Sequence, residues 1–232
     1  ALILGVLALI SAPLVGATEW VEGKHYYAVH ATRPLGVRPG KIVVTEVFSY
    51  ACPACNLFAP IANRMKAALP ANAELEFVPA SFRADEDWPM FQKAYYAAQA
   101  LGVDRKTHEA MFDAVWKTGE LAVFDSVSRQ PKRPMPTLED AAKWYAKKGG
   151  VTVDAFLAEA KGFTVDRKSR EAEQLIRACQ VVSTPTIIVN GKYRADASSA
   201  GGYDQRPRED THAASNRLPL SQRRDVLVFR TE

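Results

Sequence analysis

The sequence has few cysteines, little net charge and no long apolar run. Three cysteines in 232 residues are too few for a small scaffold held together by disulfides. Thirty basic against 26 acidic residues give a net charge of +4, too small an excess to indicate a nucleic-acid-binding surface. The longest apolar run, residues 1–10, is shorter than the roughly 20 residues of a membrane-spanning helix. The remaining composition is typical of a globular protein of one or two domains.

The first seventeen residues have the pattern of a secretory signal peptide. The apolar run from Ala1 to Ile10 is followed by a stretch that ends in Val15-Gly16-Ala17, a small-residue pattern that signal peptidase accepts. Pro13 interrupts the segment, which favours cleavage over a membrane anchor. We expect removal of residues 1–17 and a mature chain in an oxidising compartment, where disulfides persist.

Two of the three cysteines form the motif Cys52-Pro53-Ala54-Cys55. Residues 41–48 before it are apolar and largely β-branched, which predicts a buried strand. After it, apolar residues recur at helical spacing and stop at Pro70. The motif is therefore predicted to lie at a turn from a strand into a helix.

This placement predicts a reactive thiol. Proline suits the first helical position because its missing N–H would have no partner there, so Cys52 falls at the N-cap. The free N–H groups and the helix dipole favour a thiolate and should lower the pKa of Cys52. Cys55 lies one turn further on the same face, within reach of a disulfide. We expect Cys52 to be the attacking thiol and Cys55 the resolving thiol.

Two other interpretations of the motif are less well supported. A zinc site needs a second pair of ligands, and the four histidines offer none near another cysteine: His25, His30, His108 and His212. A structural disulfide across so short a loop would constrain little of the chain. A redox-active dithiol without a metal is favoured.

A second motif lies about 130 residues later. Residues 181–192 read as a loop with Thr184-Pro185, a short buried strand and an Asn190-Gly191 hairpin turn. Together with the first motif, this pattern resembles the thioredoxin superfamily. The resemblance implies that Pro185 is cis and lies against the active-site disulfide, and that the backbone of Thr184 pairs with an extended substrate peptide.

Between the two motifs, residues 88–179 have an almost entirely helical pattern. A helical domain inserted into a thioredoxin fold is similar to the DsbA family of periplasmic oxidoreductases, from about Trp20 to Gln205. The expected class is α/β. Residues 18–87 and 180–205 would form the thioredoxin-like domain and 88–179 the insertion. Residues 206–232 contain six arginines, no lysine and two prolines, and are expected to be a divergent, disordered tail or the product of an altered reading frame.

The family resemblance assigns an acid/base role to Glu46, whose burial would raise its pKa so that it exchanges a proton with Cys55. The alternative is an ordinary glutamate at the edge of a strand. Some relatives carry a lysine partner on the next strand, and none occurs in residues 73–80.

Two further positions bear on the redox chemistry. Well-known members of the family have histidine where this chain has Ala54. Pro53 and Ala54, the two residues between the cysteines, are expected to tune the redox potential. Without an imidazole beside the sulfur, the protein should be a weaker oxidant than those relatives, yet still an oxidant. Cys179 is expected to be a buried small hydrophobic residue. A regulatory or intermolecular thiol is the alternative.

The sequence thus predicts a monomeric periplasmic thiol:disulfide oxidoreductase that donates its Cys52-Cys55 disulfide to newly secreted proteins. No FAD, NAD or metal motif is present, so no cofactor is expected, and the resemblance implies reoxidation by a quinone-linked membrane partner of the DsbB type. Two alternatives are a disulfide reductase or isomerase that uses the same cysteines, and a peptide-binding chaperone module in which they are incidental.

Overall fold

The structure is a computed structural model that describes residues 20–30, 38–197 and 199. The predicted signal peptide, residues 1–17, and the predicted tail, residues 206–232, lie outside the described residues.

The core of the fold is a mixed sheet in the order β1-β5-β4-β2-β3. Its strands are Tyr27–Ala28 (β1), Ile42–Phe48 (β2), Ala73–Pro79 (β3), Thr186–Val189 (β4) and Tyr193–Asp196 (β5). β2 runs parallel to β3 and antiparallel to β4, and β5 pairs antiparallel with both β4 and β1. All seven residues of β2 are buried, as expected for a central strand whose two faces are covered.

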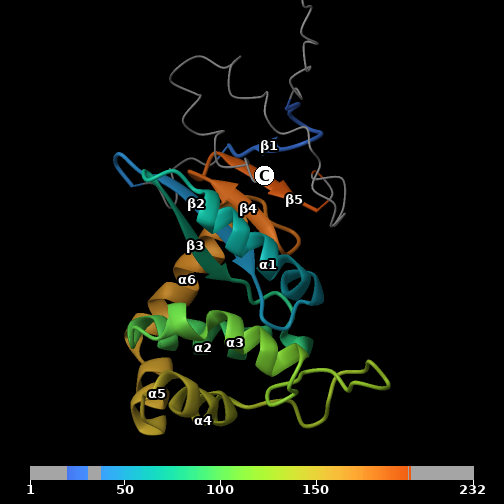
Figure 1. The fold of residues 1–232 in the computed structure, drawn as a ribbon, viewed down its shortest axis with the longest axis vertical. Helices are drawn as coiled ribbons and strands as arrows, with labels where there is room; N and C mark the ends of the chain where they lie inside the picture. The colour runs from blue at the N-terminus through green and yellow to red at the C-terminus, as the bar shows by residue number, and fades with distance from the viewer. Residues whose placement is uncertain (1–19, 31–37, 198, 200–232) are drawn as a thin grey trace, which may run out of the picture.

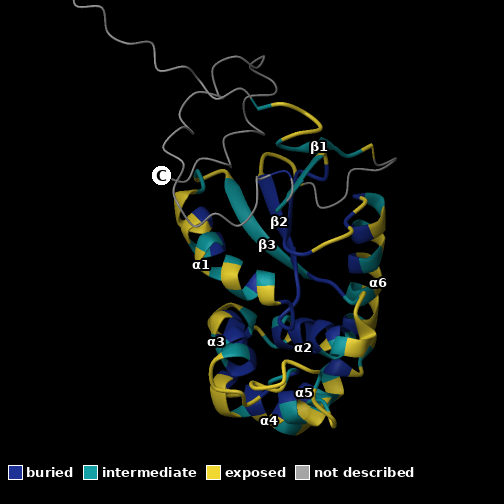
Figure 2. Cartoon of the chain, turned by 90° about the vertical axis from the view of Figure 1, so that its right-hand side faces the viewer, coloured by how far each residue is buried: buried dark blue, intermediate teal, exposed yellow. Residues whose placement is uncertain are grey.

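The described residues also form six helices, Pro53–Ala68 (α1), Trp88–Ala100 (α2), Asp104–Trp116 (α3), Leu138–Gly149 (α4), Val153–Ala160 (α5) and Phe163–Ala178 (α6), and one 3-10 turn, Ala84–Glu86 (η1). α1 and α6 lie on opposite faces of the sheet (Figure 2). The helices α2 to α5 gather beyond one end of it (Figure 1). In the chain, α2 to α6 all lie between β3 and β4.

The strand and helix predicted around the first cysteine motif are confirmed. β2 begins at Ile42 and ends at Phe48, and α1 begins at Pro53. The helix ends at Ala68, with Leu69 as its C-cap immediately before Pro70. This end follows from the restriction that a proline places on the residue before it.

The prediction of an almost entirely helical segment 88–179 is wrong for residues 117–137, which contain no helix. Pro131, Pro134 and Pro136 lie in this stretch and lack the N–H that a helix interior requires. Instead, the Asp125 carboxylate accepts hydrogen bonds from the backbone N–H groups of Val127 and Ser128. This connection is therefore a long loop between α3 and α4.

The second motif forms the hairpin that the sequence predicts. β4 and β5 are joined by Asn190, Gly191 and Lys192. The Lys192 N–H donates to the Val189 carbonyl at 2.9 Å, and the two central residues of this turn, Asn190 and Gly191, have φ angles of +51° and +63°. Positive φ at both central residues is characteristic of a type I′ turn. The Thr184-Pro185 bond is cis.

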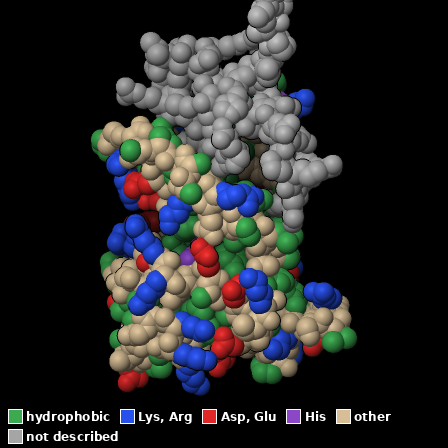
Figure 3. Space-filling model, viewed as in Figure 1, with side chains coloured by type: hydrophobic (Ala, Val, Ile, Leu, Met, Phe, Trp, Pro, Cys, Tyr) green, Lys and Arg blue, Asp and Glu red, His purple; other side chains and the backbone are tan. Residues whose placement is uncertain are grey.

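Charged side chains of both signs are interspersed over the face shown in Figure 3. None of the helices in residues 20–30 and 38–197 is long and apolar enough to cross a membrane.

Candidate active site

The turn from β2 into α1 places Cys52 at the helix N-cap, as predicted. Pro53 occupies the first helical position, and the Cys52 sulfur accepts a hydrogen bond from the backbone N–H of Cys55 at 3.4 Å. In this structure the cysteines are free thiols. The sulfur of Cys52 thus lies where the unpaired N–H groups of the helix converge.

This environment lowers the pKa of Cys52 from 9.0 to about 6. The largest cause is the hydrogen bond from the Cys55 thiol. Burial opposes the shift, while the Thr184 side chain and the backbone N–H groups of Cys55 and Ala54 add to it. The thiolate predicted from the N-cap position is therefore supported by several donors rather than by the helix dipole alone.

Cys55 has the opposite character. Its side chain is completely buried, and burial, followed by the neighbouring Cys52, raises the pKa of the Cys55 thiol well above its ordinary value. Cys52 retains a small exposed fraction of 5%. The two cysteines therefore differ in exposure and in proton affinity: Cys52 is slightly exposed and has the more acidic thiol.

Glu46 lies in the central strand β2 and is only 2% exposed. The interpretation as a strand-edge glutamate is wrong, because β2 has neighbours on both sides. Burial, followed by the charge of Cys52, raises the pKa of Glu46 to about 8. Its direct register partner on β3 is Phe77, and its Oε2 atom has no hydrogen-bond partner in the described chain.

The loop before β4 meets the cysteines from the other side. The Cys52 thiol contacts the carbonyl oxygen of Thr184 at 3.5 Å, across 132 positions of sequence. Thr184 is joined to Pro185 by a cis peptide bond. The structure thus brings together the two motifs that the sequence analysis singled out.

Helix α3 contacts the loop that carries Cys52, and no sequence pattern predicts this contact. The Trp116 indole N–H donates to the carbonyl oxygen of Tyr50 at 2.7 Å, and His108 Nδ1 lies 2.9 Å from the Tyr50 hydroxyl. Burial lowers the pKa of His108 to about 3, so its ring is neutral near pH 7. Helix α3 therefore holds Tyr50, two residues before Cys52, at both its backbone and its side chain.

Cys179 is completely buried at the end of α6. Burial raises the pKa of its thiol to about 11, so a reactive thiolate is disfavoured. These observations agree with a small hydrophobic residue and count against a regulatory thiol. Among the described residues, no three histidine, cysteine or acidic side chains form a group that could hold a metal ion.

Known proteins share both the sequence and the fold. A family model described as thioredoxin matches residues 30–205. The thiol:disulfide interchange protein DsbA of Pseudomonas syringae pv. tomato is 34% identical over 85% of this chain and 87% of its own length. The DsbA of Pseudomonas aeruginosa is 32% identical, covering 82% of each chain.

Solved structures give the same result. The crystal structure of Pseudomonas aeruginosa DsbA has a TM-score of 0.63 and 33% identity over 78% of this chain and 85% of that chain. The oxidoreductase DsbA from Xylella fastidiosa has a TM-score of 0.66 and 32% identity over 76% and 88%. These similarities confirm the predicted thioredoxin-like DsbA fold and identify an enzyme that acts on protein thiols and disulfides. With an N-cap cysteine pair beside a cis-proline loop, this chain belongs to the DsbA family of thiol:disulfide oxidoreductases.

Proposed function

We propose that the protein oxidises cysteine pairs in newly secreted proteins by donating a Cys52-Cys55 disulfide. The observation that carries this direction is the low pKa of Cys52, about 6. A stabilised thiolate favours the reduced form of the protein, and so makes its disulfide a strong acceptor of electrons.

The reaction proceeds in two exchanges. A substrate thiolate attacks the Cys52 sulfur, so that a mixed disulfide forms and Cys55 leaves with the electron pair of the broken bond. A second substrate thiolate then attacks the substrate sulfur of the mixed disulfide and releases Cys52 as a thiolate. The substrate loses two electrons and gains a disulfide, while the protein is left as a dithiol. Cys52 is the point of attack because it retains a small exposed fraction, whereas Cys55 is completely buried.

Glu46 would supply the proton that Cys55 needs when it leaves. With a pKa of about 8, its carboxyl group is mainly protonated at pH 7. The pKa of the Cys55 thiol is raised well above 9.0, so transfer of the proton from the carboxyl to the departing Cys55 thiolate is favourable. In the reverse direction, the carboxylate would accept the proton as the disulfide re-forms.

The substrate would lie beside Thr184 and Pro185 as an extended peptide. The Thr184 carbonyl contacts the Cys52 sulfur, so backbone pairing at Thr184 would place a substrate thiol at that sulfur. Each of the two motifs has an exposed apolar side chain near it in the sequence: Leu57 lies two positions after Cys55, and Val182 lies two positions before Thr184. Apolar segments, which unfolded proteins expose, fit such a surface.

The residues between the cysteines would set the potential. Pro53 fixes the start of α1 and with it the N-cap position of Cys52. Ala54 contributes its backbone N–H but no imidazole, so the potential should lie below that of relatives with histidine there.

The remaining features follow from the family and the predicted signal peptide. We propose a periplasmic location, a monomeric state, no bound cofactor and reoxidation by a quinone-linked membrane partner of the DsbB type. The proposed domain division is 18–87 with 180–205 for the thioredoxin-like part and 88–179 for the helical insertion. The position of α2 to α6 between β3 and β4 supports this division.

The test is oxidation of a reduced, unfolded protein such as ribonuclease, followed by recovery of its activity. The native chain should accelerate oxidation, Cys52→Ser should abolish it, and the matched control Cys179→Ser should retain it. Equilibration with glutathione should give a potential well above the value of thioredoxin, about −270 mV. A potential near that value would indicate a reductase. A chaperone would be indicated if the native chain showed no oxidase activity and Cys52→Ser still suppressed aggregation.

A further inference from the structure

The turn between β2 and α1 begins at Ser49. The Cys52 N–H donates to the Ser49 carbonyl at 3.1 Å, which closes a four-residue β-turn from Ser49 to Cys52. The strand is fixed just before this turn, because the Phe48 carbonyl accepts a hydrogen bond from the Ala80 N–H at 2.8 Å. The placement of Cys52 at the helix N-cap therefore depends on the turn that Ser49 opens.

The Ser49 side chain stabilises the turn from inside. Its hydroxyl oxygen accepts a hydrogen bond from the Ala51 N–H at 3.2 Å, a local contact by which serine favours turns. Ser49 is 1% exposed and Ala51 is completely buried, so water does not readily replace this contact. A buried N–H that loses its partner costs free energy. The hydroxyl group thus helps to keep the turn in one conformation.

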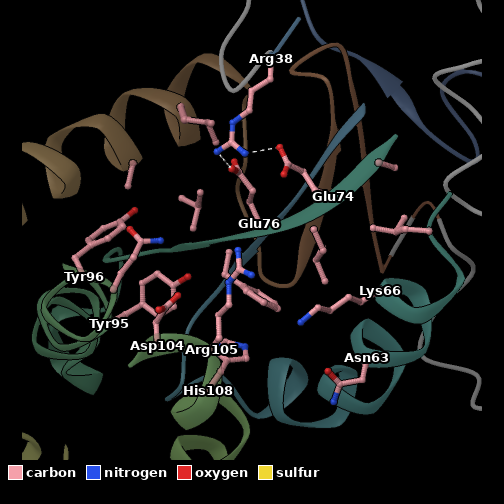
Figure 4. Close-up of a pocket in the computed structure, with 18 of the residues that line it drawn as sticks. Arg38, Asn63, Lys66, Glu74, Glu76, Tyr95, Tyr96, Asp104, Arg105 and His108 are labelled. Atoms are coloured by element: carbon pink, nitrogen blue, oxygen red, sulfur yellow. Dashed lines mark hydrogen bonds and ion pairs between the residues drawn. The ribbon is translucent and has the colours of Figure 1, made fainter. Parts of the chain in front are cut away.

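Helix α3 supports the turn from outside, at Tyr50. His108 and Trp116 bind the hydroxyl group and the carbonyl of Tyr50. His108 also lines a cavity of about 840 Å³ beside β3 (Figure 4). No residue in the range 49–55 lines that cavity, so the turn and the cysteine pair are closed off from it. The support from α3 ends at Tyr50, whereas Ser49 reaches the cysteines themselves.

The backbone N–H of Ser49 points to the second cysteine. It donates a hydrogen bond to the Cys55 sulfur, and within the described part of the chain no backbone carbonyl accepts from it. The Ser49 carbonyl binds the Cys52 N–H on the other side of the same residue. Ser49 therefore holds both members of the cysteine pair through its backbone.

This hydrogen bond bears on the charge that Cys55 carries when it leaves. Burial, then Cys52 and then the charge of Glu46 raise the pKa of the Cys55 thiol, and the hydrogen bond from the Ser49 N–H acts in the opposite direction. A thiol of lower pKa leaves faster in disulfide exchange. A fixed N–H group that faces developing negative charge also lowers the energy of the transition state.

We propose that Ser49 is a positioning residue for the opening of the disulfide. Its hydroxyl group and carbonyl fix the turn, so that its N–H faces the sulfur of Cys55 as that sulfur leaves. A substrate thiolate forms a bond to the Cys52 sulfur, the bond from Cys52 to Cys55 breaks, and its electron pair passes to the Cys55 sulfur. The Ser49 N–H stabilises this anion until Glu46 supplies a proton. The role rests on the proposed function, because it concerns the first exchange of that reaction.

The kinetic test follows cleavage of the Cys52-Cys55 disulfide by dithiothreitol. The attack on Cys52 limits the rate, because the second thiol of the reagent then reacts intramolecularly. Ser49→Ala frees the Ala51 N–H and loosens the turn, so we expect cleavage to slow about tenfold or more. Ser49→Thr keeps the hydroxyl group and should restore most of the native rate.

The matched control is Ser81→Ala, which removes the hydrogen bond from the Ser81 hydroxyl to Glu173 at 2.7 Å. This variant loses a partly buried serine hydrogen bond away from the turn and should be cleaved at the native rate. A native rate in Ser49→Ala would overturn the proposal. A threonine variant as slow as the alanine variant would also overturn it, because the hydroxyl group would then not be what positions the N–H.

Amide hydrogen exchange tests the contact with sulfur and does not require Ser49→Ala to fold. In the reduced protein, Cys55→Ala removes the acceptor, so the Ser49 amide should exchange about tenfold faster or more relative to the Ala80 amide. Ala80 is the internal control because its N–H donates to the Phe48 carbonyl in both proteins. An unchanged ratio would refute the proposal.

Both readouts are independent of the direction in which the protein works. They follow the cleavage of its own disulfide and the exchange of its own amide, not the oxidation of a substrate. A protein that proved to be a reductase would contradict the proposed function and leave these two results as they are, whereas a native cleavage rate in Ser49→Ala would contradict the role of Ser49 alone.

Discussion

The stability of the reduced protein should depend on the Cys52 thiolate. The pKa of Cys52 is about 6 in the folded chain against an ordinary value of 9.0. An acid with a lowered pKa in the folded state stabilises that state fully above its unfolded pKa, and the contribution is lost as the pH falls through the folded pKa. The reduced protein should therefore gain stability from Cys52 between pH 6 and pH 9 and none below pH 5.

The perturbation is Cys52→Ser, which keeps a small polar side chain at the N-cap but removes the ionisation. One pKa unit corresponds to about 1.4 kcal/mol. pH 7 lies about one unit above the pKa of Cys52 in the folded chain. The variant should therefore lose about 1.4 kcal/mol of unfolding free energy at this pH. At pH 5 the ionisation should contribute nearly nothing. Any packing difference between serine and cysteine is independent of pH and appears as a constant offset.

The assay is urea unfolding of both proteins under reducing conditions at several values between pH 5 and pH 7.5. The free-energy difference between the two proteins isolates Cys52, because other groups titrate in both. The upper limit avoids the titration of Glu46, whose pKa of about 8 depends in part on the charge of Cys52. A difference that stays flat across this range would refute the stabilised thiolate, and with it the proposed direction of electron flow.

Three further variants test neighbouring parts of the site. Glu46→Gln should stabilise the protein by about 3 kcal/mol at pH 7 and hardly at all at pH 4.5. The reason is that the pKa of the Glu46 carboxyl is raised to about 8 in the folded chain, so this group destabilises the fold as the pH rises above its pKa in the unfolded chain. Equal unfolding free energies for variant and native chain at pH 7 would contradict this. Ala54→His should lower the pKa of Cys52 and raise the potential by about 30 mV per unit, measured against glutathione, and an unchanged potential would exclude an imidazole effect. Trp116→Phe should lose the hydrogen bond to Tyr50 and destabilise the protein by about 1 kcal/mol. It should also raise the pKa of Cys52, which is measured by the absorbance of the thiolate. A loss of stability without a pKa change would mean that the contact is only structural.

The part of the site that could be predicted from the sequence is the part that local signals determine. Pro53 and the apolar periods on either side of it are enough to place Cys52 at a helix N-cap. The position of Thr184 and Pro185 beside Cys52 is different, because their 132-residue separation is bridged by tertiary structure. Only the family resemblance, and not any local pattern, predicted that contact.

Other features depended on contacts that no local pattern specifies. Trp116 reads as one more apolar residue on a helical face, yet its N–H binds a carbonyl 66 residues earlier. The loop at 117–137 was misassigned because the helical periods on both sides of it are strong, although Pro131 and its neighbours were available as a signal against helix.

Glu46 shows why strand order decides chemistry. A glutamate in an apolar strand is compatible with a sheet edge or a sheet centre, and the sequence does not contain the pairing that distinguishes them. With β4 on one side and β3 on the other, the carboxyl group is buried, and its register partner is Phe77 rather than a cation. A lysine at that place would stabilise the carboxylate and lower its pKa. Phenylalanine carries no charge that would offset the rise in pKa caused by burial, so the Glu46 carboxyl keeps its proton at neutral pH. Because the Cys55 thiol binds a proton more tightly still, Glu46 is suited to give that proton up at the moment when the disulfide opens.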